Sequence, residues 1–79
     1  MLLFIYSLDK KLFEGEASQV TLPSDDGEIT ILSGHATLAS SLKSGQIKIQ
    51  SAGQKEETFS VKSGFAYTDG KETIVFSRD

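Results

Sequence analysis

Hydrophobic and polar residues alternate with a period of two over much of the chain. The pattern is clearest at residues 28–32, 46–50 and 58–61, where a large apolar residue recurs at every second position. Successive side chains of a β-strand point to opposite faces, so this alternation predicts strands with one buried face. An apolar and aromatic segment at residues 2–8, which ends at Asp9-Lys10-Lys11, predicts a further strand.

Turn-forming and strand-breaking residues separate these segments. Residues 12–22 form a second extended stretch, and we expect a bulge or bend in it at Glu14-Gly15-Glu16. Pro23 is expected to end ladder pairing, because proline has no N–H group to donate. The segment Asp25-Asp26-Gly27 predicts a turn, since Asp and Gly both tolerate turn geometry.

The last part of the chain is typical of a β-hairpin. Asp69-Gly70 lies between the extended runs 65–68 and 72–76, and this dipeptide favours a type I′ turn. Residues 36–43 are ambiguous, because Leu38 and Leu42 share the spacing of a helical face. Eight residues are too few to establish a helix, so this segment is read as extended or as a single turn.

Short strands at intervals of about ten residues predict an all-β fold, an antiparallel sandwich or barrel. The sequence shows no internal repeat, low-complexity tract or linker, so residues 1–79 are expected to form a single domain.

The composition narrows the function classes. The net charge is −3, the opposite sign to that of a nucleic-acid binder. The chain contains no cysteine, which excludes disulfides and thiolate metal sites. The apolar start at residues 2–8 has no basic flank and is too short for a signal peptide or a membrane span. We therefore expect no nucleic-acid partner and no insertion into lipid.

Candidate chemistry is sparse. A small hydrolase could use Ser33 with His35, which would lie on one face of a strand, but no nucleophile elbow or orienting acid accompanies them. Asp25, Asp26 and Glu28 could offer oxygen ligands, yet their spacing does not match a calcium loop. No glycine-rich phosphate loop is present. The sequence thus predicts no catalytic, metal or cofactor site.

The order of four motifs carries a family resemblance. The chain reads F-x-G-E-x-x-x-V-x-x-P at 13–23, G-E-x-x-I-L-x-G-H-A at 27–36, L-K-x-G-x-I-x-I at 42–49 and F-x-V-x-x-G-F at 59–65. This succession resembles the N-terminal β-sandwich of the epsilon subunit family of bacterial F-type ATP synthases, over nearly the whole chain. The resemblance implies a two-sheet antiparallel sandwich, and with the strand spacing we expect about 8–10 short strands.

The resemblance also implies a function without a reaction centre. Members of the family lie at the foot of the central stalk, where they contact the gamma subunit and the polar loops of the membrane c-ring. They help couple proton flow to rotary ATP synthesis, as peripheral subunits on the cytoplasmic face of the inner (plasma) membrane. Many continue into a C-terminal helical hairpin. This sequence ends at Asp79, directly after the last predicted strand, so a short form without the hairpin is expected.

Position by position, the resemblance assigns contacts to particular residues. Asp25, Asp26 and Glu28 correspond to the loop that meets the c-ring, where an exposed arginine is usual. His35 and Ser40 fall where the family's sandwich faces gamma. Family prolines are replaced by the residues Ser33, Thr37 and Ser44.

An alternative interpretation is a free-standing sandwich that binds a peptide or a carbohydrate on exposed aromatic rings. Most of the seven aromatic residues lie at alternating positions that predict burial, and Tyr67 is the first candidate for exposure.

Overall fold

A computed structural model of the protein describes residues 1–78, which form nine β-strands and no helix. In chain order the strands are β1 (Leu2–Tyr6), β2 (Lys11–Glu16), β3 (Gln19–Ser24), β4 (Gly27–Leu32), β5 (Leu38–Leu42), β6 (Gly45–Gln50), β7 (Glu57–Val61), β8 (Ser63–Thr68) and β9 (Glu72–Arg78). The predicted all-β class is confirmed, and the ambiguous segment 36–43 contains a strand.

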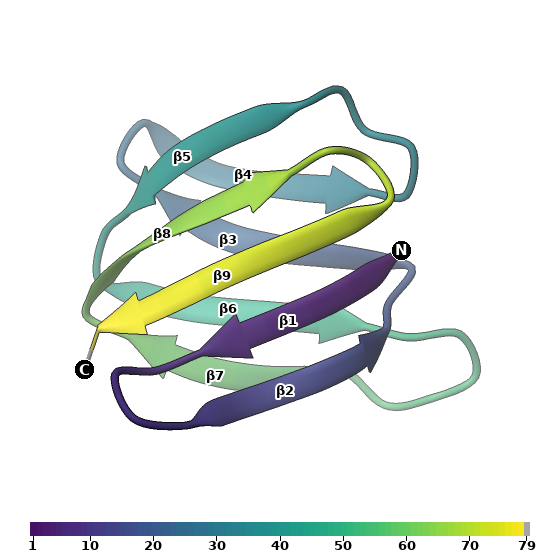
Figure 1. Ribbon diagram of the computed structural model, residues 1–79, viewed down its shortest axis with the longest axis horizontal. Coiled ribbons are helices and arrows are strands. Elements are labelled where there is room, and N and C mark those ends of the chain that lie inside the picture. Colours follow the sequence, from purple (N-terminus) through teal and green to yellow (C-terminus); the bar gives the residue numbers. More distant parts are fainter. Residues whose placement is uncertain (79) are drawn as a thin grey trace.

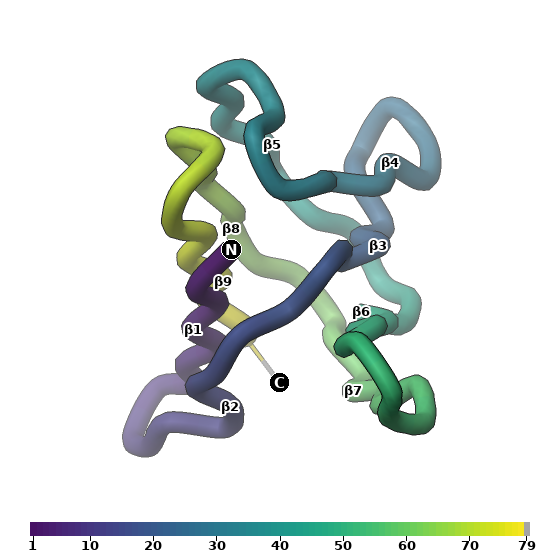
Figure 2. Tube along the Cα trace, turned by 90° about the vertical axis from the view of Figure 1, so that its right-hand side faces the viewer, coloured from purple at the N-terminus to yellow at the C-terminus, as the bar shows by residue number. Residues whose placement is uncertain are grey.

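The nine strands form one continuous hydrogen-bonded sheet that curls into two layers. The strand order is β2-β1-β9-β8-β5-β3-β6-β7, and β4 pairs with β3 off this path. One layer therefore contains β2, β1, β9 and β8, and the other contains β4, β3, β6 and β7. Strand β5 joins the layers, because it pairs with β8 along its length and with β3 only at Leu42. The edge-on view in Figure 2 shows the two layers on either side, with β5 between them at one margin.

The core lies between the layers and is built from the inward positions of the alternating pattern. Leu22, Ile31, Ile47 and Ile49 come from one layer, and Leu3, Ile5 and Val75 come from the other. All of them are essentially fully buried. Burying such a side chain stabilises the fold by about 1.5–3 kcal/mol. Because these residues recur at every second position, the core confirms the strand pattern on which the fold prediction rested.

Strand pairing departs from the prediction at two places. The sandwich was expected to be antiparallel throughout, but β1 and β9 pair in parallel (Figure 1). Pro23 does not end the ladder, because it lies within β3 opposite Glu28 and its carbonyl accepts from the Lys43 N–H at 2.8 Å. A proline lacks only the donor, so a position that needs an acceptor tolerates it.

The predicted bend at Glu14-Gly15-Glu16 is also wrong. Strand β2 continues through Glu16, which pairs with Leu2, and the register shift falls instead between Ile5 and Tyr6 of β1. Ile5 pairs with Phe13 and Tyr6 pairs with Lys11, so Leu12 is the extra residue of the bulge. Gly15 needs no special conformation, because a Cβ there would make only ordinary contacts with the Phe13 ring.

The hairpin between β8 and β9 has a different turn from the one predicted. A type I′ turn needs positive φ at both central residues, here Asp69 and Gly70. Gly70 has a φ of 90°, but Asp69 does not have a positive φ, because only glycines do so within residues 1–78. The carboxylate of Asp69 closes the loop instead, since Oδ1 accepts from the backbone N–H groups of Lys71 and Glu72, both at 2.9 Å. The Asp69 side chain, and not a type I′ backbone geometry, therefore stabilises this turn.

Replacing this carboxylate should weaken the hairpin in a pH-dependent way. The N–H groups of Glu72 and Lys71 hold the pKa of Asp69 below its ordinary value of 3.8. A depressed pKa contributes stability that is present above the ordinary value and is lost as the pH falls through the lowered one. Asp69→Ala is therefore expected to lower the thermal midpoint at neutral pH and to have less effect near about pH 2. Thermal melts at both pH values test this, and an equal loss at both would contradict it.

Candidate functional site

The predicted contact residues lie at opposite ends of the sandwich. The turn between β3 and β4 carries Asp25 and Asp26, and Glu28 follows it; these three carboxylates are called the acidic turn. The loop between β4 and β5 carries His35 and lies at the other end, beside the β8–β9 turn and near the N-terminus (Figure 1). The two ends are separated by the length of the strands.

The acidic turn is exposed and is held by its backbone. Asp25, Asp26 and Glu28 are all exposed. The Asp25 N–H donates to the Ser41 carbonyl at 3.0 Å, and the Asp26 N–H donates to Ser24 Oγ at 3.3 Å. None of these bonds involves a carboxylate of the turn, so the three charges are available to a partner.

Glu28 differs from the two aspartates in its surroundings. It lines a shallow hollow of about 360 Å³ together with Lys43 and Lys48. The two lysines offset the charge of Glu28, whereas Asp25 and Asp26 project from the tip of the turn. The negative potential of this end therefore centres on the two aspartates.

His35 is half-buried in a loop that is tied to the neighbouring hairpin. The Gly34 N–H donates to the Gly70 carbonyl at 2.9 Å, and the His35 N–H donates to the Leu32 carbonyl at 3.0 Å. The imidazole Nδ1 lies 2.7 Å from the Ala36 carbonyl oxygen. Since a carbonyl only accepts, Nδ1 carries a hydrogen in this contact, and Nε2 remains as the second polar atom of the ring. This loop presents a partly apolar ring with a polar edge.

The arrangement does not support a hydrolytic pair. Ser33 and His35 were placed on one face of a strand, but β4 ends at Leu32, and both residues lie in the turn and loop that follow. The polar contact of the imidazole is with the Ala36 backbone. Within residues 1–78, no group of three His, Asp or Glu side chains is placed to hold a metal ion.

Ser40 lies closer to the acidic turn than to His35. Its side chain points to the inner side of β5, where its Oγ is 2.9 Å from Ser24 Oγ, the same atom that accepts from the Asp26 N–H. Ser40 and His35 are thus on one margin of the sandwich but are not brought together. The structure links Ser40 to the backbone of the acidic turn.

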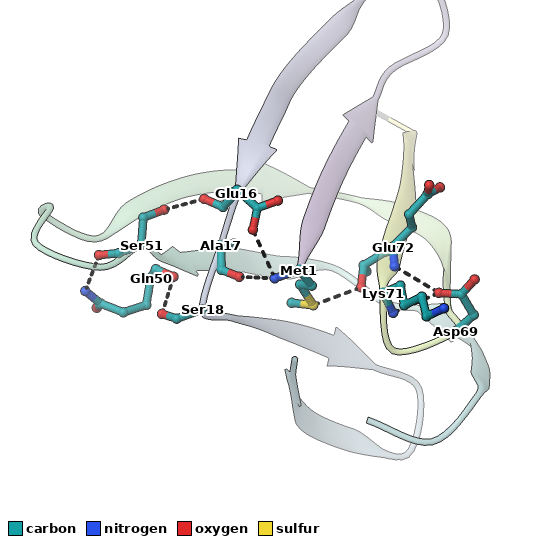
Figure 3. A network of polar contacts seen from close by, with 10 residues as sticks. Met1, Glu16, Ala17, Ser18, Gln50, Ser51, Asp69, Lys71 and Glu72 are labelled. Carbon is teal, nitrogen blue, oxygen red and sulfur yellow. Dashed lines mark hydrogen bonds and ion pairs between the residues drawn. The ribbon is translucent and has the colours of Figure 1, made fainter. Parts of the chain in front are cut away.

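A network of polar contacts closes the end of the sandwich where His35 lies (Figure 3). The Met1 amino group donates to the Ala17 carbonyl at 2.9 Å and lies 3.4 Å from a carboxylate oxygen of Glu16. Ser18 Oγ donates to the Gln50 carbonyl at 2.8 Å, and Ser51 Oγ donates to the Glu16 carbonyl at 3.1 Å. The Ser51–Glu16 bond crosses between the two layers, whereas the other contacts join neighbouring strands within a layer, so this one bond ties the layers together at this end.

An outward face of aromatic rings was missed by the sequence interpretation. Phe65, Tyr67 and Phe76 were read mainly as core residues, with only Tyr67 singled out for exposure, but they are 46%, 43% and 55% exposed. Tyr6 stacks on Phe76 with ring centroids 5.8 Å apart, and on Phe4 at 6.1 Å. We call these five side chains on the outer side of β1, β8 and β9 the aromatic face.

The sequence did contain a signal for the aromatic face, because large and small residues alternate along β8 and β9. The inward positions of β8 and β9 hold Ala66, Thr68, Thr73 and Val75. These side chains are smaller than their outward neighbours, so the larger rings of the hairpin are left outside.

The structure is a small β-sandwich suited to contacts with other proteins. It has a small core, two exposed ends of different chemistry and an aromatic outer face. Such a surface distributes its polar and apolar groups over the outside, where a partner can reach them.

The chain belongs to the family described as "ATP synthase, Delta/Epsilon chain, beta-sandwich domain", whose model matches residues 1–79. The resemblance noted in the sequence is therefore confirmed.

Curated relatives support the assignment. An ATP synthase epsilon chain of Dichelobacter nodosus is 38% identical over 74 residues, which cover 94% of this chain and 52% of the relative. One from Campylobacter jejuni is 42% identical over 67 residues, covering 85% of this chain and 52% of the relative. The chain thus spans about half the length of these relatives. A third relative, the ATP synthase epsilon chain of Chlorobium limicola, is 34% identical over 75 residues, which cover 95% of this chain and 85% of the relative.

Solved structures share the fold. A chain of the Euglena gracilis mitochondrial ATP synthase, in a structure described as OSCP/F1/c-ring, superposes with a TM-score of 0.88 at 21% identity, covering 95% of this chain and 48% of that one. A chain of the Tetrahymena thermophila mitochondrial ATP synthase, from its central stalk and c-ring, gives 0.83 at 13% identity, covering 99% and 63%. At these identities the likeness establishes the fold.

Proposed function

We propose that this chain works in the central stalk of a proton-translocating ATP synthase, where it docks on the gamma subunit and on the c-ring. It helps couple ion flow to rotary ATP synthesis, has no reaction centre of its own, and acts as a peripheral subunit on the cytoplasmic face of the inner (plasma) membrane. Residues 1–78 contain no helix long and apolar enough to span a bilayer.

The observation that carries the proposal is the separation of the two candidate contact regions on one packed body. The acidic turn lies at one end, and His35 lies in a loop at the other. The strands and their shared core connect the two ends, and the Ser51–Glu16 hydrogen bond ties the layers together at one of them. A subunit that transmits torque between two partners needs separate contact surfaces and a body that does not shear between them.

Charge gives each region a distinct role. Asp25 and Asp26 would face the polar loops of the c-ring, in which the family resemblance implies an arginine. Complementary charges set the choice of partner and the register more than they add affinity. His35 and, along the same margin, Ser40 would contact gamma. The half-buried imidazole ring would cover apolar atoms of gamma, while Nε2 would form a hydrogen bond with it.

The assignment of His35 can be tested by binding. The parent chain is expected to co-purify with its cognate gamma subunit, and His35→Ala should weaken that binding by about tenfold through loss of an interface hydrogen bond and ring contact. Because the ring bonds only to its neighbour's backbone, the thermal midpoint should stay close to that of the parent. Failure of the folded parent chain to bind gamma would overturn the proposed function.

The exposed aromatic face favours one alternative, a free-standing module that binds a peptide or a carbohydrate. Aromatic rings on an open sheet can stack on such ligands. Glycan-array and peptide-array binding by the purified chain, together with no binding to gamma, would support this second function.

A further inference from the structure

The sequence contains two Asp-Gly dipeptides, and the fold places them in hairpin turns with different surroundings. Asp26-Gly27 ends the turn between β3 and β4, and Asp69-Gly70 begins the turn between β8 and β9. An aspartate before glycine is prone to rearrange into isoaspartate, because glycine has no Cβ to hinder attack by its backbone nitrogen on the aspartate carboxyl carbon. Two copies in one chain allow the effect of the fold on this reaction to be compared directly.

The rearrangement needs a mobile carboxyl group and a backbone nitrogen that can reach it. The side chain and the peptide plane must both rotate before the nitrogen meets Cγ in a reactive geometry. A carboxylate is a poor target for a nucleophile, so the group must also take up a proton. A turn that fixes the carboxyl group, keeps it ionised or encloses the glycine therefore opposes the reaction.

The carboxyl group of Asp69 is held in place. Its Oδ1 atom accepts from the N–H groups of Lys71 and Glu72, both at 2.9 Å. The N–H groups of Glu72 and Lys71 also hold the pKa of this carboxyl below its ordinary value, so it stays ionised to lower pH. Both effects oppose attack on its carbon.

The glycine of the same dipeptide is enclosed. Gly70 is buried, its N–H donates to Thr68 Oγ1 at 3.1 Å, and its carbonyl accepts from the Gly34 N–H at 2.9 Å. A Cβ at Gly70 would lie 2.6 Å from the His35 carbonyl oxygen. The peptide unit between Asp69 and Gly70 cannot rotate without breaking bonds to its own hairpin and to the neighbouring loop.

The Asp26-Gly27 copy lacks these restraints. Asp26 is exposed, and its carboxylate makes no hydrogen bond within residues 1–78. A Cβ at Gly27 would meet no atom within 4 Å beyond its chain neighbours. Gly27 pairs with Ser24 at the end of the β3–β4 ladder, where strands open most easily. The N–H bonds of Asp25 and Asp26 hold the turn on the N-terminal side of the peptide unit that must rotate.

We propose that Asp26 is a modification site, at which the folded chain converts aspartate into isoaspartate without an enzyme, while the fold protects Asp69. After the carboxylate takes up a proton, the Gly27 nitrogen attacks Asp26 Cγ. A C–N bond forms, a Cγ–O bond breaks, and the hydroxyl group leaves as water with the hydrogen of the nitrogen. Water then opens the succinimide ring at its main-chain carbonyl, so the side-chain carboxyl carries the peptide bond and no oxidant or cofactor is consumed.

The product keeps one negative charge at position 26 but changes the main chain. One carbon atom is added to the backbone between Asp26 and Gly27, and the free carboxylate moves to the α-carbon. Because two residues link Ser24 to Gly27 in this turn, the added atom reshapes its tip. The modified turn becomes a substrate for methyltransferases that esterify isoaspartyl carboxylates. This inference goes beyond the proposed function and does not depend on which partner the turn contacts.

The test is prolonged incubation of the purified, folded chain at neutral pH. The chain has no asparagine, so isoaspartate can arise only from aspartate. Trypsin cleaves after lysine and places the two dipeptides in separate peptides, 12–43 and 63–71. Methyl transfer by an isoaspartyl methyltransferase measures the product, and electron-transfer fragmentation assigns its position. Peptide 12–43 should contain at least about tenfold more isoaspartate than peptide 63–71, since misplaced reacting atoms lower a rate by large factors.

Two controls separate the effect of the fold from that of the sequence. The chain unfolded in guanidinium chloride should accumulate isoaspartate at similar levels in both peptides, because neither dipeptide is restrained there. Asp26→Glu keeps the charge but would have to close a larger ring, so peptide 12–43 of the folded variant should lose its signal. The proposal is overturned if the folded parent forms no isoaspartate at position 26, or forms as much at position 69. It is also overturned if the unfolded chain shows the same preference as the folded one.

Discussion

Reversal of the acidic turn to lysine (Asp25→Lys, Asp26→Lys, Glu28→Lys) is expected to remove most of the coupling between proton flow and ATP synthesis. Under the proposed assignment, carboxylates that would face the arginine of the c-ring loops become cations. Like charges placed opposite each other cost several kcal/mol, which corresponds to well over a tenfold loss of contact (about 1.4 kcal/mol per factor of ten). Proton-driven ATP synthesis in inverted membrane vesicles measures the loss directly.

The sandwich itself should tolerate this reversal. The turn is held by backbone donors, and its carboxylates make no hydrogen bond within residues 1–78. Exposed charges of this kind contribute only about 0–1 kcal/mol to stability. Glu56→Lys with Glu57→Lys, which reverses exposed charges at the other end of the sandwich, is the matched control. Coupling equal to that of the parent in the turn variant would show that these residues do not contact the c-ring.

Gly64→Ala is expected to cause a large loss of stability, because among the glycines its added Cβ would meet a neighbouring atom most closely. The new Cβ would lie 2.1 Å from the Phe76 carbonyl oxygen and 3.2 Å from its carbonyl carbon. Both are backbone atoms of the paired strand, so relief requires β8 and β9 to separate. Such overpacking costs about 1–3 kcal/mol or more, a large part of the roughly 4–12 kcal/mol expected for a chain of this length.

Gly15→Ala provides the control for this prediction. Gly15 also lies within a strand, but its added Cβ would meet the Phe13 ring at 3.6 Å, an ordinary contact. We expect its unfolding free energy to stay within about 0.5 kcal/mol of the parent. Urea titration of both variants gives the comparison. A Gly64→Ala chain as stable as Gly15→Ala would mean that β8 and β9 are not as closely paired as the structure shows.

Much of the fold follows from the period of two, because a buried face imposes that period wherever a strand forms. The inward residues Ile29, Ile31, Ile47 and Ile49 were predictable for this reason, although Ile29 is only partly buried. The pairing of distant strands was not predictable in the same way. The parallel contact of β1 with β9 joins the two ends of the sequence, and nothing local to either strand encodes it.

Two of the local errors have one physical cause. The prediction for Pro23 rested on its missing N–H, and the prediction for Asp69 rested on the backbone turn that Asp-Gly favours. In the structure, other atoms of these two residues form the important hydrogen bonds. The Pro23 carbonyl accepts a bond although its nitrogen cannot donate one, and the Asp69 carboxylate replaces the turn geometry that Asp-Gly normally favours. Whether a carbonyl or a carboxylate accepts a hydrogen bond depends on which donors the folded chain places beside it, so residue type alone does not predict it.

The candidate site was predictable only in part. The exposure of Asp25 and Asp26 follows from a charged turn, whereas the aromatic face depends on which side of β8 and β9 meets the other layer. Phe65 and Phe76 fit a core position by residue type, but their strands put Ala66 and Val75 inward instead. The separation of the acidic turn from His35 also required the three-dimensional arrangement.

The proposed contact between the acidic turn and the c-ring can be tested most directly by cross-linking in the assembled complex. The parent chain has no cysteine, so Asp26→Cys introduces a single thiol at the tip of the turn. Paired with a cysteine in the polar loop of the c subunit, it should form a disulfide on mild oxidation, whereas Lys55→Cys at the opposite end should not. A cross-link from position 55 in the absence of one from position 26 would contradict the orientation on which the account depends.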